Sequence, residues 1–138
     1  MTEEQTRLVK NSWKKLRNVN AVIIGDLFYT KLFFDYPRLR KMFPENMEQQ
    51  NKKLIDMLTY IASNIDNFEA IENDIKKLGE RHIAYGASSR HYQIIGANLI
   101  WTLEKAIGTD WDNQLKEAWL VCYDTVVKTM TGTAQNTA

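Results

Sequence analysis

The side chains of this sequence that could do chemistry are polar groups on helical faces that are otherwise apolar. His82 follows Ile75 and Leu78 at intervals of four and three residues, the spacing of one face of an α-helix. A buried imidazole needs a hydrogen-bond partner or a metal ion to offset its lost hydration. From spacing alone, a hydrogen-bonded core histidine is the more common outcome, and a metal ligand is the alternative.

Two further hydrogen-bonding groups, Tyr29 and Gln50, occupy apolar faces of two other predicted helices. A packed core seldom buries three such groups without a polar partner that they share. A bound cofactor with a polar centre and an apolar rim would satisfy all three. In the alternative interpretation, Gln50 is solvated and the Tyr29 hydroxyl bonds to a backbone carbonyl.

The remaining candidates have simpler interpretations. His91 stands at the start of a predicted helix, where solvent exposure or a capping role is expected. The single cysteine, Cys122, shares an apolar helical face with Trp119 and Val126, so we expect a buried thiol. No glycine-rich phosphate loop, paired-cysteine metal motif or nucleophile elbow occurs, and no carboxylate pair lies on an inner face. The usual enzyme signatures are therefore absent.

The elements that must position these residues are helices. Only two prolines and six glycines interrupt the 138 residues, and no hairpin signal occurs, which predicts an all-α fold and one domain over residues 1–138. Pro37 and Pro44 bracket a corner. The expected helices cover about residues 2–17, 20–34, 47–64, 66–85, 91–107 and 111–130, and residues 131–138 form a frayed tail.

Local signals sharpen several of these helices. Thr2 and Gln5 form a capping-box pattern, Ser88 or Ser89 can cap the helix over 91–107, and Gly108 ends it. Gly25 lies inside a helix, where glycine costs about 1 kcal/mol relative to alanine. We expect another helix to cross closely at that glycine.

Composition excludes several classes of protein. Eighteen Lys and Arg against seventeen Asp and Glu give a net charge of +1, which argues against nucleic acid as a partner. No apolar run approaches the roughly 20 residues of a membrane span. The acidic, polar N-terminus differs from a secretory signal, so we expect a cytoplasmic protein.

The order of motifs resembles the bacterial single-domain haemoglobins related to the globin domain of flavohaemoglobins. The resemblance covers roughly residues 2–130, and the stretch 99–103 with Trp111 and Trp119 resembles a thermophile member in particular. It implies an all-α globin fold, a three-on-three helical sandwich around haem b. The residues that carry it are Leu27-Phe28-Tyr29, Leu32-Phe33, Tyr36 to Phe43, Gln50, Leu54, Arg81 to Gly86 and His91-Tyr92.

The resemblance also implies a role for each site residue. His82 would be the axial iron ligand, oriented by a hydrogen bond from its other ring nitrogen to the Leu78 carbonyl or to Tyr92. Tyr29, Gln50 and Leu54 would line the distal side, where the gas binds. The residues implied to contact the cofactor are Phe43 against the porphyrin, Lys53 beside a propionate, Tyr92 and Ile95.

The function implied is tight, reversible binding of oxygen and other diatomic gases such as nitric oxide and carbon monoxide, for oxygen storage, transport or delivery. Oxygen bound to ferrous iron has superoxide character, so hydrogen bonds from Tyr29 and Gln50 would contribute about 1.5–3 kcal/mol each. An amide is a poor iron ligand, so the sixth position should stay open. Two alternatives remain: a nitric oxide dioxygenase, and a haemless globin-like interaction module.

Two departures from the flavohaemoglobin pattern bear on this choice. The 138 residues include no segment after the globin part that could be a reductase, so we expect a dioxygenase to depend on a separate reductase. Ala134 stands about where that group has a carboxylate that hydrogen-bonds the proximal histidine. Without the carboxylate, we expect reversible gas binding rather than peroxidase-like activation.

Overall fold

The computed structural model describes residues 1–84 and 86–132, without the side chains of Val19 and Asn20. These residues form five α-helices and three short 3-10 helices and contain no strand, which confirms the all-α prediction. In chain order the elements are α1 (Glu3–Asp35), η1 (Pro37–Met42), α2 (Glu48–Ser63), η2 (Ile65–Ala70), α3 (Glu72–Ala84), α4 (Ser89–Ile107), η3 (Gly108–Asp110) and α5 (Asn113–Thr131).

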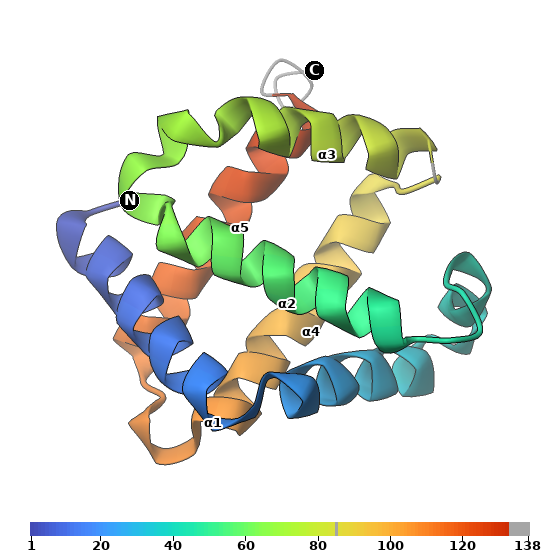
Figure 1. The fold of residues 1–138 in the computed structure, drawn as a ribbon, viewed down its shortest axis with the longest axis horizontal. Coiled ribbons are helices and arrows are strands. Elements are labelled where there is room, and N and C mark those ends of the chain that lie inside the picture. The colour runs from blue at the N-terminus through green and yellow to red at the C-terminus, as the bar shows by residue number, and fades with distance from the viewer. Residues whose placement is uncertain (85, 133–138) are drawn as a thin grey trace.

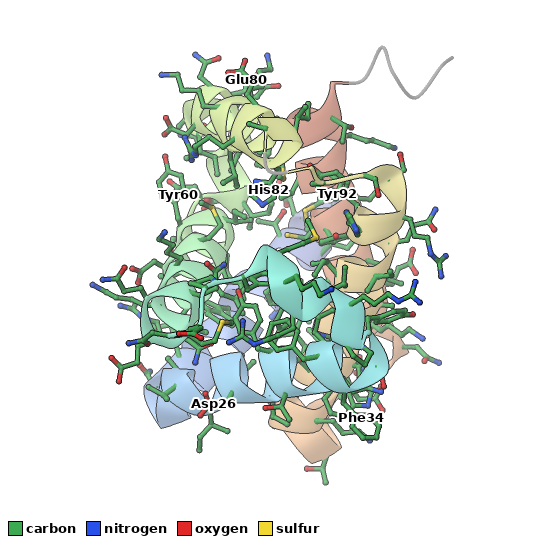
Figure 2. The ribbon with its side chains drawn as sticks, turned by 90° about the vertical axis from the view of Figure 1, so that its right-hand side faces the viewer. Asp26, Phe34, Tyr60, Glu80, His82 and Tyr92 are labelled. Atoms are coloured by element: carbon green, nitrogen blue, oxygen red, sulfur yellow. The ribbon has the colours of Figure 1, made fainter. Side chains whose placement is uncertain are left out.

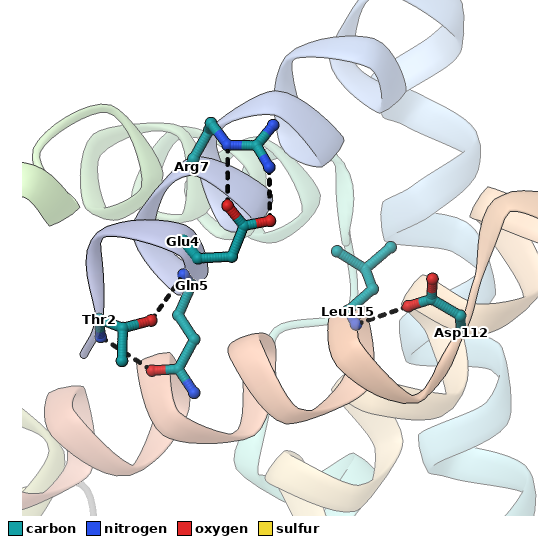
Figure 3. Close-up of polar contacts among 6 residues, drawn as sticks. All are labelled: Thr2, Glu4, Gln5, Arg7, Asp112 and Leu115. Atoms are coloured by element: carbon teal, nitrogen blue, oxygen red, sulfur yellow. Dashed lines mark hydrogen bonds and ion pairs between the residues drawn. The ribbon is translucent and has the colours of Figure 1, made fainter.

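The first two predicted helices, 2–17 and 20–34, are wrong as separate elements, because α1 runs unbroken from Glu3 to Asp35. No proline or glycine occurs between Glu3 and Gly25 to interrupt the helical hydrogen bonds. The predicted capping box is confirmed: the Gln5 amide donates to Thr2 Oγ1, and the Thr2 amide donates to Gln5 Oε1, both at 3.0 Å (Figure 3). Figure 1 shows that α1 bends, so its first and second halves run in different directions.

The predicted helix over 66–85 is also wrong as a single element, because the segment divides into η2 and α3. Asn67 has a non-helical backbone at φ −142°, ψ 57°. Asparagine is a weak helix former, because its side chain competes for nearby backbone groups. The predicted end near Tyr85 lies outside the described residues.

The other three helices agree with prediction to within two residues at each end. Ser88 caps α4, accepting from the His91 amide, and Gly108 ends that helix at φ 72°. Asp112 caps α5 by accepting from the Leu115 amide at 2.8 Å (Figure 3). The expected frayed tail begins inside α5 at Thr131, and its remainder, 133–138, lies outside the described residues.

The packing of the helices places Tyr29 and Gln50 on α1 and α2, and His82 and Tyr92 on α3 and α4. α1 packs against α2, α4 and α5, and α3 packs against α5. In Figure 1, α2 passes in front of α4, while α3 lies along the opposite edge from the second half of α1. The core includes Trp13, Phe28, Leu32, Ile75, Leu103 and Trp119. Within the described residues, no helix is long and apolar enough to cross a membrane.

Candidate functional site

The crossing of α1 and α2 brings Tyr29 and Gln50 together. A Cβ atom on Gly25 would lie 3.2 Å from Asn51 Cβ, so the predicted close crossing at this glycine is confirmed. At the same crossing, Asn51 Nδ2 donates to Asp26 Oδ1 at 3.0 Å. One turn further along α1, Gln50 Nε2 donates to the Tyr29 hydroxyl at 3.2 Å. We call this the distal pair.

The electrostatics keep Tyr29 a neutral phenol. Its side chain is 7% exposed. Burial raises the pKa of the Tyr29 hydroxyl, and the hydrogen bond from Gln50 opposes that rise only in part. Because the hydroxyl oxygen accepts from Gln50, its own hydrogen is free to be donated to a third group.

The corner after α1 places Phe43 beside the distal pair. The Phe43 ring packs edge-on against Tyr29, with centroids 5.6 Å apart, and against Phe33 at 5.3 Å. Arg40 holds the corner by donating to the carbonyls of Phe43 at 3.2 Å and Pro44 at 2.8 Å. This side therefore combines two polar donors with an aromatic wall.

On the opposite side, His82 is half-buried and held by its own helix. His82 Nδ1 lies 2.8 Å from the Leu78 carbonyl oxygen, which confirms one of the two predicted hydrogen-bond partners. A carbonyl only accepts, so Nδ1 carries the proton and Nε2 of the neutral ring keeps its lone pair. Nε2 makes no hydrogen bond to any described residue.

Tyr92, on α4, forms the neighbouring surface. Its ring lies nearly parallel to the His82 ring, at 27° with centroids 6.5 Å apart (Figure 2). The Tyr92 hydroxyl is buried, and no described residue hydrogen-bonds to it. We call Tyr92 and His82 the proximal pair. Burying a hydroxyl without a hydrogen-bond partner lowers the stability of the fold by about 1–3 kcal/mol. The Tyr92 hydroxyl is therefore a candidate to hydrogen-bond a bound group.

Two close contacts from α5 support the proximal pair. The Tyr123 hydroxyl donates to the Tyr92 carbonyl oxygen at 2.5 Å, and burial raises the pKa of Tyr123, which keeps it a donor. Gly96 makes room for the Tyr123 ring, since a Cβ there would lie 2.5 Å from that ring. On α3, a Cβ on Gly79 would lie 2.0 Å from the Met130 carbonyl oxygen, so only glycine allows this approach.

Comparison with known proteins places this geometry in a family. The family model described as Globin matches residues 26–130. The chain belongs to the globin family. Neuroglobin of Danio rerio is 28% identical, over 99% of this chain and 94% of that protein. The flavohemoprotein of Vibrio cholerae is 24% identical over 89% of this chain and 32% of its own length, so it matches in part.

Solved structures agree with this assignment. A bacterial globin from Campylobacter jejuni superposes with a TM-score of 0.81 at 28% identity, covering 94% of this chain and 93% of that one. An engineered carbene transferase, based on a provisionally assigned nitric oxide dioxygenase of Rhodothermus marinus, has a TM-score of 0.83 and 29% identity. It covers 98% of this globin and 94% of its own chain. The chain is thus a bacterial-type globin related to the globin domain of flavohaemoglobin and to neuroglobins.

Membership of this family implies a haem cofactor, and the residues present fit one. Among the described residues, no group of three His, Cys, Asp or Glu side chains could hold a bare metal ion. A single imidazole lone pair instead suits a metal whose other ligands come from the cofactor itself. The unpartnered Tyr92 hydroxyl and the free hydrogen of Tyr29 supply polar contacts on the two sides.

The other predicted site residues, Leu54, Ile95 and Lys53, form no side-chain hydrogen bond with the distal or proximal pair. Leu54 lies one turn after Gln50 on α2, and Ile95 follows Tyr92 on α4; both are half-buried and pack against the core. Lys53 is exposed and has no ion pair or hydrogen bond to a described residue. Its predicted pairing with a propionate stays a prediction.

Two residues outside the site match their expected roles. His91 is confirmed as a capping residue, since its Nδ1 accepts from the Ser88 amide at 3.1 Å. Cys122 is confirmed as buried, and burial raises the pKa of its thiol to about 12. Ala134, where a proximal carboxylate is missing by resemblance, lies outside the described residues.

Sequence reasoning missed the support from α5. Tyr123 is a polar group on the apolar face of a helix, the same signal that singled out Tyr29. Gly79 and Gly96 lie inside helices, as Gly25 does, and the argument applied to Gly25 also predicts close contacts for them.

Proposed function

We propose that this globin holds haem b through His82 Nε2 and binds oxygen reversibly, with Tyr29 and Gln50 as hydrogen-bond donors to the gas. The observation that carries the proposal is the hydrogen bond from Gln50 to Tyr29 at 3.2 Å. That bond orients the phenol and leaves its hydrogen for a ligand.

Each residue of the site has a part in the proposal. Haem iron supplies the coordination of diatomic gases. The Leu78 carbonyl keeps the proton on His82 Nδ1, so Nε2 would be the atom that binds the iron. Phe43, Leu54 and Ile95 line the apolar rim, and Lys53 neutralises a propionate. The buried Tyr92 hydroxyl, which has no partner among the described residues, would be available to donate to the bound cofactor.

The distal pair favours oxygen over carbon monoxide. A bound oxygen molecule carries partial negative charge, and hydrogen bonds to charged acceptors contribute about 1.5–3 kcal/mol. Carbon monoxide is nearly apolar when bound and gains much less. The raised pKa of Tyr29 keeps the donor protonated at neutral pH.

Ligand dissociation rates test this proposal. We expect Tyr29→Phe to release oxygen at least about tenfold faster, because about 1.4 kcal/mol corresponds to a factor of ten, while carbon monoxide release changes less. Tyr36→Phe, at a tyrosine that is 39% exposed, is the matched control and should behave as the native protein. Equal changes for both gases would remove the donor role, and a folded protein that takes up no haemin would overturn the whole proposal.

The similarity to the Rhodothermus marinus protein favours a second candidate function, nitric oxide dioxygenation. In this reaction nitric oxide and oxygen combine with one electron to give nitrate, and a reductase supplies the electron. Nitrate formed over many turnovers with an added reductase would support it. A single turnover under the same conditions would leave reversible oxygen binding as the function.

We further infer a role in oxygen storage, transport or delivery, based on the same donors. We also infer that, within the bacterial single-domain globins, this chain is related to the thermophile haemoglobin called Hell's Gate globin. Residues 99–103 with Trp111 and Trp119 support this inference. An oxygen dissociation rate too slow for release at cellular oxygen levels would contradict the delivery role.

A further inference from the structure

A surface groove of about 410 Å³ lies between the η1 corner and the start of α4. Pro37, Leu39 and Ile94 are its apolar lining residues, and Arg38 and Arg90 are exposed at its edge. We call it the corner groove. Both of its walls lie on the right-hand side of Figure 1, away from the first half of α1.

The charge around the corner groove differs from that of the whole chain. Residues 36–44 contain Arg38, Arg40 and Lys41, residues 86–94 contain Arg90, and neither segment contains an acid. Without these four cations, the rest of the chain has 14 Lys and Arg against 17 Asp and Glu. Two of these four cations, Arg38 and Arg90, line the groove itself, and the other two lie in the segment that forms one of its walls.

These cations are not neutralised locally. None of the four forms an ion pair with a described residue. Arg40 donates only to backbone carbonyls of the corner. Asp35 also lines the groove, but its carboxylate is paired with Lys31 Nζ at 2.6 Å. The groove therefore presents uncompensated positive charge next to exposed apolar surface.

The corner groove backs onto the candidate site. The segment 36–44 contains Phe43, which packs against Tyr29. The segment 86–94 contains Tyr92, which stacks on His82. A molecule bound in the groove would thus lie against the two chain segments that carry cofactor contacts.

We propose that the corner groove docks an acidic redox protein that delivers electrons to this globin, an inference that rests on the proposed haem function. Carboxylates on such a partner would face Arg38 and Arg90, and an apolar side chain would fill the lining between them. Complementary charge of this kind mainly raises the association rate. Two arginines beside an apolar groove suit a protein better than a nucleic acid, whose phosphates need a longer basic track.

Docking is tested by NMR titration with oxidised flavodoxin, a small acidic flavoprotein, at low ionic strength. We expect shifted amides to cluster in residues 36–44 and 86–94, in haem-free and haem-loaded protein alike. The double variant Arg38→Glu/Arg90→Glu should weaken binding at least about tenfold. Lys14→Glu/Lys15→Glu makes the same charge change on the first half of α1 and should have little effect.

Electron delivery is tested with flavodoxin hydroquinone and the ferric globin. One electron passes from the flavin to the iron, so the hydroquinone becomes the semiquinone and iron(III) becomes iron(II), with no bond made or broken. We expect Arg38→Glu/Arg90→Glu to slow this reaction at least about tenfold at low ionic strength, with the difference vanishing in high salt. Reduction by neutral lumiflavin hydroquinone should not change.

Three outcomes would overturn the docking proposal: equal effects of the two double variants, rates independent of salt, or shifted amides outside the corner groove. Selective binding of phosphatidylglycerol vesicles through the groove, with no flavodoxin binding, would overturn it in favour of a membrane. Failure of the haem proposal is distinguishable. A protein that rejects haemin but still binds flavodoxin at the groove supports docking and refutes the haem function.

Discussion

On the α1–α2 side of the site, the two polar groups of the distal pair hydrogen-bond to each other, since Gln50 donates to Tyr29 within a helix crossing. On the α3–α4 side, those of the proximal pair do not. The Tyr92 hydroxyl is buried without a partner, and His82 Nε2 bonds to no described residue. The distal pair therefore has an internal hydrogen bond and keeps the Tyr29 hydrogen for a ligand, whereas the proximal pair leaves the Tyr92 hydroxyl and His82 Nε2 for a cofactor.

The two sides also differ in how tightly their helices are seated. At Gly25, on the distal side, an added Cβ would meet the Asn51 side chain at 3.2 Å. At Gly79, on the proximal side, it would meet the Met130 backbone at 2.0 Å. Side chains can move aside and backbone cannot do so cheaply, so the position of His82 is set more rigidly than that of Tyr29.

The largest expected effect is on haem retention. His82→Ala removes the proposed protein ligand to iron, and we expect haem to dissociate more than about a hundredfold faster. Transfer of haem to an excess of apomyoglobin, followed by visible absorption, measures this rate. His91→Ala, at the capping histidine, is the control and should retain haem. Unchanged haem retention in His82→Ala would assign the iron to another residue.

The closer backbone contact at Gly79 predicts that alanine destabilises the protein more at Gly79 than at Gly25. We expect Gly79→Ala to lower the free energy of unfolding by about 1–3 kcal/mol, because the new methyl group clashes with the α5 backbone. Gly25→Ala should change it by less than about 1 kcal/mol, since its helix propensity gain offsets a small shift of Asn51. Urea unfolding of the two haem-free variants measures the difference. Similar values for both would contradict the rigid seating of α3.

Removal of the unpartnered Tyr92 hydroxyl should stabilise the haem-free protein, whereas most substitutions of buried residues destabilise a protein. In the haem-free protein, we expect Tyr92→Phe to raise the free energy of unfolding by about 1 kcal/mol, because it removes a buried polar atom with no partner. Tyr123→Phe, which loses its hydrogen bond to the Tyr92 carbonyl, should lower it by a similar amount. Loss of stability in Tyr92→Phe without haem would show that the hydroxyl already has a partner.

The smallest effect concerns α5, which supports the proximal side. The pKa of the Cys122 thiol rises from 9.0 to about 12 on burial, so above pH 9 the unfolded chain loses this proton while the folded chain keeps it. Stability from this group is full below pH 9 and falls as the pH rises toward 12, by about 1 kcal/mol between pH 9 and pH 10. In Cys122→Ala, the free energy of unfolding should not show this extra loss of about 1 kcal/mol between pH 9 and pH 10. An equal slope in the variant would refute the buried thiol.

Prediction from the sequence worked best where a residue acts through its own helix. Thr2, Ser88 and Gly108 mark helix ends through contacts within four residues, and all three are observed in those roles. His82 bonds to Leu78 within one turn, and Leu78 is one of the two partners that the family resemblance implies. Prediction failed where neighbouring segments compete, as in the unbroken α1 and the break at Asn67.

By itself, the sequence determined the all-α class, the inner faces of the helices, and the presence of His82, Tyr29 and Gln50 on those faces, because helical periodicity is a local property. Only the tertiary structure decided that Gln50 reaches Tyr29, that Tyr92 is left without a partner and that Gly79 seats α3 on Met130. Such contacts join residues far apart in the chain and depend on differences of a few tenths of an ångström. Helix packing sets those differences, and no local pattern of residue types records them.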